Sequence, residues 1–109
     1  MLHTLPKVEP DPQNGWQITF FLGDAFDYST PFRAVVGEIV SILEQAAPVV
    51  LDLPPYFPEE DFVEGSLRFG GASFQVYYEY SLGYLSIMSA NRAILEDVAS
   101  KVRPRVRLA

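Results

Sequence analysis

Residues 62–90 of this 109-residue chain read FVEGSLRFGGASFQVYYEYSLGYLSIMSA, and this stretch decides the fold. The pattern predicts three antiparallel strands joined by two tight turns. Gly70 and Gly71 form the first turn, because both central residues of a type I′ turn need a positive φ, which glycine adopts without steric cost. Placing Phe69 opposite Ala72 then pairs apolar residues or glycine along one face: Leu67 with Phe74, Gly65 with Val76 and Val63 with Tyr78. A slip of one residue would exchange the two faces, so the hydrophobic pattern fixes this register.

The second turn continues the same apolar face onto a third strand. With Leu82-Gly83 as the loop, the facing pairs on this face are Tyr80 with Leu85, Tyr78 with Ile87 and Val76 with Ser89. Two separate turns thus predict one core face for a three-stranded antiparallel meander.

The outward face of the meander mixes aromatic, methionine and polar side chains. Aromatic residues and methionine are enriched at protein interfaces, although single exposed apolar residues also occur on the sheets of monomers. Six tyrosines in a chain of this length favour an interaction surface. The predicted outward residues are Phe62, Glu64, Arg68, Gln75, Tyr77, Glu79, Tyr84, Ser86 and Met88.

Two amphipathic stretches on either side of the meander predict helices. Thr30-Pro31 supplies an N-cap and a first helical position, and apolar residues at helical spacing continue to Pro48. Gly37 within this helix costs about 1 kcal/mol relative to alanine, and we expect close packing on the sheet to explain it. After the meander, Asn91 caps a last helix over residues 92–103.

The order of elements is β-α-(β)-β-β-β-α, with a first strand at 16–23 and a brief apolar strand at 49–53. It predicts a single two-layer α/β (α+β) domain, with both helices packed on one face of the sheet. We expect residues 1–15, which hold three prolines, to form an extended arm. The domain spans 16–103 and a basic tail spans 104–109.

Composition excludes several classes of site. The chain has no cysteine, so disulfides, thiolate nucleophiles and cysteine metal sites are ruled out. The phosphate-binding, dinucleotide-binding and serine-hydrolase motifs do not occur, and the single histidine, His3, lies in the arm. We therefore expect no catalytic residue, metal or cofactor, and a protein that is not an enzyme. No apolar run approaches the roughly 18 residues of a membrane span, so no membrane partner is expected, and the expected location is cytoplasmic.

The net charge of −6 is unevenly distributed. Residues 1–91 carry twelve acidic and three basic residues, whereas residues 92–109 carry five basic and two acidic ones. An acidic body does not suit DNA, because nucleic-acid affinity rests on neutralising phosphates. We interpret the basic residues near the C-terminus as a solvated positive end that also complements the dipole of the last helix: Lys101, Arg103, Arg105 and Arg107.

Asp24 and Asp27 follow the first predicted strand. Aspartates are typical of turns and caps, where their oxygens accept backbone N–H bonds. A pair of carboxylates at a strand end also suits metal binding or acid–base chemistry. We favour the structural interpretation, because no third ligand lies nearby in the sequence.

A proline-rich loop, Pro54–Pro58, connects the brief strand to the meander. Its prolines make it stiff, so its exposed aromatic residues would lose little entropy on docking. Two interpretations stay open: a recognition loop, or a connector whose aromatic residues cover the core. The loop carries Tyr56 and Phe57 and precedes three acidic residues, Glu59, Glu60 and Asp61.

These observations favour a small acidic protein-binding module that docks a basic protein partner. Bacterial immunity and antitoxin proteins, which neutralise a toxin or nuclease, share this size and charge. The alternatives are a small-molecule-binding domain or carboxylate-based enzyme that uses the Asp24/Asp27 loop, and a homo-oligomer, such as a homodimer, joined through the outward face. The expected partner contacts are Asp24, Asp27, Tyr56, Glu59, Glu60, Asp61, Tyr77 and Glu79.

Overall fold

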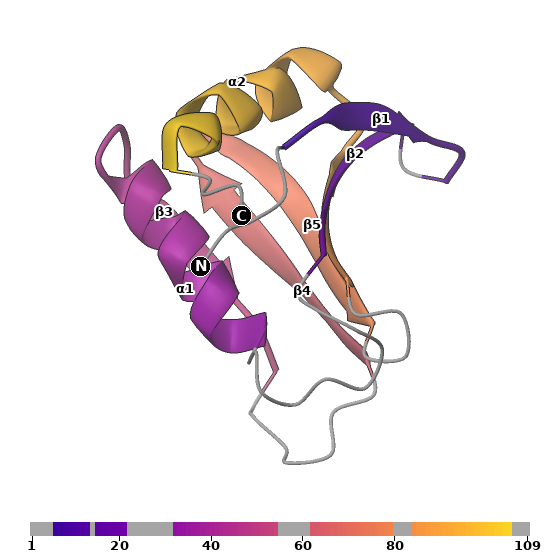
Figure 1. Cartoon of the computed structure of the whole chain (residues 1–109), viewed down its shortest axis with the longest axis horizontal. Coiled ribbons are helices and arrows are strands. Elements are labelled where there is room, and N and C mark those ends of the chain that lie inside the picture. Colours follow the sequence, from indigo (N-terminus) through magenta and orange to yellow (C-terminus); the bar gives the residue numbers. More distant parts are fainter. Residues whose placement is uncertain (1–5, 14, 22–31, 55–61, 80–83, 106–109) are drawn as a thin grey trace.

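The computed structural model describes residues 6–13, 15–21, 32–54, 62–79 and 84–105 (Figure 1). The strands form one six-stranded antiparallel sheet in the order β1-β2-β6-β5-β4-β3. Two helices pack against one face of it, which confirms the predicted two-layer α+β fold. In chain order the elements are β1 (Val8–Asp11), β2 (Gly15–Phe21), α1 (Phe32–Glu44), β3 (Val49–Asp52), β4 (Phe62–Phe69), β5 (Ala72–Glu79), β6 (Tyr84–Ser89), α2 (Arg92–Val102) and a 3-10 turn at Arg103–Arg105.

The first hairpin of the meander has the predicted register. Phe69 of β4 faces Ala72 of β5, and pairing continues without a bulge to Phe62 opposite Glu79. Gly70 and Gly71 adopt φ values of 58° and 81°. Both values lie in the left-handed region that glycine enters without steric cost, so the two glycines allow the tight turn.

The second hairpin differs from the prediction by two residues. Tyr78 faces Leu85, and Val76 faces Ile87, where the sequence predicted Ile87 and Ser89 as their partners. The proposed Leu82-Gly83 loop lies outside the described residues. Because side chains alternate with a period of two, a shift of two residues leaves every side chain on its predicted face. The hydrophobic pattern therefore determined the face but not the pairing.

The segment predicted to be an extended arm contributes the edge strand β1. Its Pro10 pairs with Trp16 of β2, and an edge strand tolerates proline because one side of its backbone has no ladder partner. In the connection that follows, the Gln13 backbone N–H donates to Asp11 Oδ1 at 3.2 Å. Gly15 then starts β2 with a φ of 100°. The prolines of the segment predicted an extended arm outside the sheet, whereas its edge position permits a strand.

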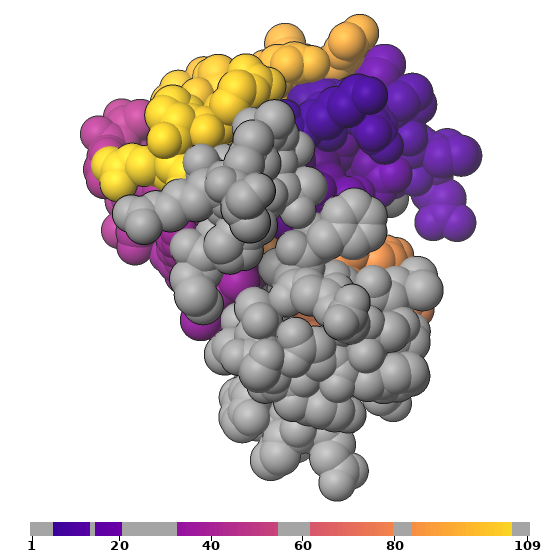
Figure 2. Space-filling view, in the orientation of Figure 1, coloured from indigo at the N-terminus to yellow at the C-terminus, as the bar shows by residue number. Residues whose placement is uncertain are grey.

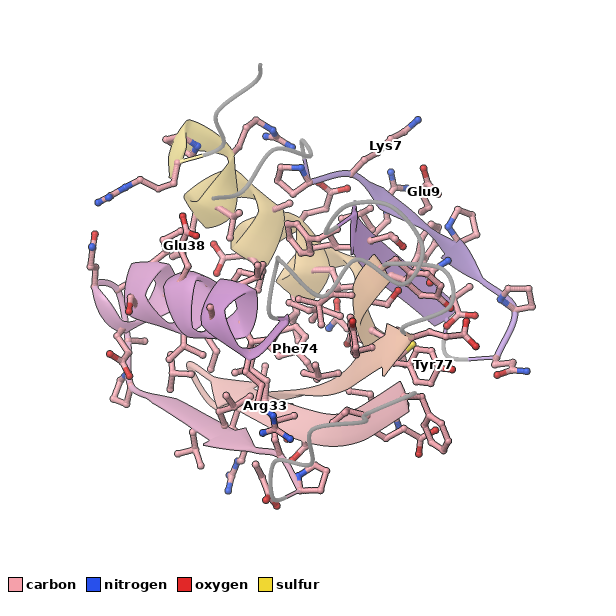
Figure 3. All side chains as sticks on the ribbon, turned by 60° about the horizontal axis from the view of Figure 1, so that its bottom comes forward. Lys7, Glu9, Arg33, Glu38, Phe74 and Tyr77 are labelled. Atoms are coloured by element: carbon pink, nitrogen blue, oxygen red, sulfur yellow. The ribbon has the colours of Figure 1, made fainter. Side chains whose placement is uncertain are left out.

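The core lies between the sheet and the two helices. Phe20 and Phe74 are among its largest fully buried side chains, and Figure 3 shows Phe74 between α1 and the sheet. Neither α1 nor α2 is long and apolar enough to cross a membrane. The helices contribute Val35, Val36, Ile39, Ile42, Leu43, Leu95, Val98, Ala99 and Val102 to this core.

The helix predictions have mixed outcomes. Asn91 caps α2 as predicted, with its Oδ1 accepting from the backbone N–H groups of Ala93 at 3.0 Å and Ile94 at 3.4 Å. Thr30-Pro31 lies outside the described residues. The expectation that Gly37 packs closely on the sheet is wrong. Gly37 is exposed, and a Cβ added there would meet nothing within 4 Å.

Basic residues near the C-terminus make contacts within the chain. Lys101 Nζ lies 2.7 Å from Asp97 Oδ1 in the last turns of α2. Arg103 donates to the carbonyl oxygen of Pro6 at 3.3 Å, which helps to hold α2 beside β1 (Figure 1, Figure 2). Arg105 donates to Gln45 Oε1 at 3.3 Å, just beyond the end of α1. Arg103 and Arg105 thus connect the C-terminal end of α2 to neighbouring parts of the chain.

Candidate functional site

The face of the sheet opposite the helices carries an excess of negative charge. We call it the helix-free face, meaning the outward-pointing residues of the described strands. Arg68 is the basic residue among these strand residues. Figure 3 shows Glu9 on the outer edge strand β1. The acidic residues of the helix-free face are Glu9, Asp11, Asp52, Glu64 and Glu79.

A groove of about 530 Å³ lies on this face. Its lining extends from β1 to β4, which is four strand spacings or about 19 Å. No lysine or arginine is among the described residues that line it, whereas Asp11 and Glu64 both do. The lining residues are Asp11, Gln13, Gln17, Glu64, Gly65, Gln75, Tyr77, Tyr84, Ser86 and Met88.

Three aromatic side chains cross β4, β5 and β6 beside the groove. Phe62 and Tyr77 stack with ring centroids 6.4 Å apart and planes at 25°. Tyr77 and Tyr84 follow at 6.1 Å and 43°. We call these three residues the aromatic row. Phe62 is 61% exposed although it is a large apolar residue, so the row offers apolar area at the edge of a polar groove.

Glu79 lies beside the two tyrosines of the aromatic row. It directly faces Tyr84 across the β5–β6 pair, and its carboxylate is close enough to influence the hydroxyl groups of Tyr77 and Tyr84. Burial, and then the negative charge of Glu79, raise the pKa of both tyrosines above 10.0. Both phenols therefore carry their protons at neutral pH. Because Tyr77 contacts the rings of both Phe62 and Tyr84, the row is preorganised for a partner.

Replacing Glu79 with glutamine is expected to lower the pKa of Tyr77 and of Tyr84. The change removes the negative charge but leaves the burial, so both values fall toward 10 without reaching it. NMR titration of isotope-labelled tyrosine measures this, with Glu44→Gln on α1 as the matched control. Unchanged tyrosine pKa values in Glu79→Gln would contradict the assigned role of the carboxylate.

The same raised pKa values have a consequence for stability. The folded state holds the two phenolic protons more tightly than the unfolded state does. These two protons therefore contribute their full share to the free energy of unfolding below a pH of about 10. The contribution is lost as the pH rises through the pKa values of the folded state. In Glu79→Gln this alkaline loss is expected to be smaller.

The floor of the groove is polar. Ser86 is only 2% exposed although it points to the helix-free face. Its hydroxyl lies 3.4 Å from the hydroxyl of Thr19 on β2. Gln17 and Gln75 face Met88 from either side. Amide, hydroxyl and thioether groups thus form the floor, while carboxylates and tyrosines form the walls.

Of the predicted contact residues, Tyr77 and Glu79 are brought together on the helix-free face. Asp24 and Asp27 lie outside the described residues, so a role for that loop stays a prediction. The sequence did not identify Asp11, because its segment was predicted to be an arm. Asp11 and Tyr84 line the same groove, so β1 and β6 face a common space, and the charge of Asp11 contributes to the raised pKa of Tyr84. The other predicted contacts outside the described residues are Tyr56, Glu59, Glu60 and Asp61.

Among the described residues, no group of three or more histidine, cysteine, aspartate or glutamate side chains could hold a metal ion. The geometry instead describes an acidic, partly aromatic groove on the helix-free face. Its aromatic and methionine side chains are of the kinds enriched at protein interfaces. Comparison with known proteins yields no relative: no family model, no curated protein and no solved structure matches this chain.

Proposed function

We propose that this chain is a protein-binding module that receives a basic segment of a partner protein on the helix-free face. The observation that carries the proposal is the groove, which two carboxylates line and which has no lysine or arginine among its described lining residues. The positive potential of a basic surface complements the negative potential of the groove. This complementarity speeds association and disfavours partners of the wrong charge. The adjoining aromatic row supplies the apolar contact area that charge alone lacks.

A basic partner suits this face better than a second copy of the chain. In a two-fold symmetric dimer the same patch lies on both sides of the interface. Such a dimer would bring the acidic groups of the two faces, including Glu64 and Asp11, toward one another. Like charges brought together oppose association. The charge of the face therefore favours a different protein over self-association.

The biological class that we propose is an immunity or antitoxin protein of the bacterial cytoplasm, which neutralises a basic toxin or nuclease. This rests on the small size of the chain, its net charge of −6 and the acidic groove. Binding a basic, nucleic-acid-directed surface would block that surface by occupying it. The carboxylates of the groove are negatively charged, as are the phosphates of the nucleic acid that such a partner binds.

Reversing the charge of Glu64 is expected to weaken partner binding strongly. Glu64 is exposed on β4 and lines the groove, so Glu64→Lys changes the groove without disturbing the core. Glu44→Lys makes the same change at an exposed position on α1, on the opposite side of the sheet. Affinity capture from extract of the native cell, at low and moderate salt and with quantitative mass spectrometry, compares the two variants with the wild type.

The proposal predicts a basic protein that is held by the wild type and by Glu44→Lys, and that elutes as salt rises. Glu64→Lys is expected to hold it at least about tenfold more weakly. Equal capture by Glu64→Lys and Glu44→Lys would show that the helix-free face is not the binding surface.

A further inference from the structure

The groove offers a specific set of groups to a cation. Glu64 faces Tyr77 directly across the β4–β5 pair, so their Cβ atoms lie about 5 Å apart. A carboxylate and an aromatic ring thus stand side by side at one wall. Gln75 and Gln17, on the floor, add amide oxygens that accept hydrogen bonds.

We propose that the group which the groove binds is the guanidinium of an arginine side chain on the partner. This inference rests on the proposed function and names the chemistry of its partner. A guanidinium is planar, weakly hydrated and stacks on aromatic faces, while its N–H groups donate in the plane of the group. Stacked against Tyr77, an arginine directs those donors toward the Glu64 carboxylate and the floor amides.

A lysine side chain uses this arrangement less well. Its ammonium group is compact and strongly hydrated, and it does not form planar, forked hydrogen bonds to a carboxylate. The tyrosine rings are also held by their contacts with one another and with Phe62. A fixed ring stacks on a flat group without a further loss of side-chain entropy. The groove therefore distinguishes the two basic residues by shape as well as by charge.

The chain contains a probe for this test at the right place. It has two methionines, Met1 and Met88, and Met88 lines the groove. Protein with isotope-labelled methionine methyl groups therefore gives two NMR signals. The Met88 signal reports on the groove.

The ligands are three short peptides of one sequence that differ only at the positions that hold arginine, lysine or citrulline. Citrulline keeps the planar shape of arginine but carries no charge. The arginine peptide is expected to shift the Met88 signal and to bind about three- to tenfold more tightly than the lysine peptide. The citrulline peptide is expected to leave the signal in place.

Two variants connect this preference to the named residues. Tyr77→Leu keeps an apolar side chain but removes the ring, so it is expected to reduce the advantage of arginine over lysine. Glu64→Gln keeps the shape but removes the charge, so it is expected to weaken both peptides. If Tyr77→Leu leaves the ratio of the two affinities unchanged, the stacking role of Tyr77 is wrong.

Equal affinities for arginine and lysine peptides, or a Met88 signal that moves with none of the three, would overturn the arginine inference. The proposed function is judged separately, by whether capture of the whole partner depends on Glu64. Loss of capture in Glu64→Lys together with equal peptide affinities would leave a basic partner and remove only the preference for arginine.

Discussion

Phe74→Ala is expected to lower the free energy of unfolding by about 3–5 kcal/mol, the largest loss among the substitutions considered. Phe74 is 2% exposed and lies between the sheet and the helices. The substitution removes the buried ring and leaves a cavity in the core, which the neighbouring side chains fill only in part. Urea denaturation measures the change, with an unaltered slope indicating that the same structure unfolds.

The matched control is Phe62→Ala on the neighbouring strand β4. Phe62 is 61% exposed and points to the helix-free face, so the same substitution is expected to cost less than about 1 kcal/mol, mainly through its contact with Tyr77. Equal losses in the two variants would mean that the assignment of inner and outer faces is wrong.

Gly65→Ala is expected to destabilise the fold by about 1–3 kcal/mol, although alanine normally suits a strand better than glycine. A Cβ at position 65 would lie 2.4 Å from the carbonyl oxygen of Asp52 and 2.5 Å from Cδ2 of Leu53. The first of these atoms belongs to backbone and cannot move without disturbing the β3–β4 pairing. Thermal or urea unfolding of the purified variant measures the loss.

Gly37→Ala makes the same chemical change where there is open space. Gly37 lies in α1 and a Cβ there meets nothing within 4 Å, so alanine is expected to raise the free energy of unfolding by about 0.5–1 kcal/mol. Substitution with alanine is thus expected to lower the free energy of unfolding at position 65 and to raise it at position 37. A gain at position 65, or a loss at position 37, would contradict the packing described at that site.

Much of the fold could be predicted from the sequence because alternation of apolar and polar residues reports directly on burial. This is why the faces of the meander and the Gly70-Gly71 turn were right. Alternation is unchanged by a shift of two residues, so it could not distinguish Leu85 from Ile87 as the partner of Tyr78. The role of Gly37 was mistaken for a related reason, because sequence shows that a side chain is missing but not what surrounds the vacant position.

The candidate site was predicted less completely. Tyr77 and Glu79 were identified because they occupy outward positions of one strand. The groove also needs Asp11, which reaches the same space only because β1 pairs with β2 and β2 with β6. That arrangement depends on contacts between distant segments, and the prolines around β1 concealed it. A local pattern does not contain this information.

The position of β6 in the sheet has a consequence for how the chain folds. β6 lies between the hairpin β1–β2 and the group β3–β4–β5, and it joins the two. Phe21 pairs with Tyr84, 63 positions later in the chain, so closing the sheet requires a long loop to form. During synthesis the N-terminal hairpin emerges well before β6, its neighbour in the sheet, and before α2, which packs beside β1 and β2. The free edge of β2 and the inner face of the hairpin therefore stay exposed until the C-terminal part of the chain has left the ribosome, so we expect the hairpin to depend on rapid late folding or on chaperones.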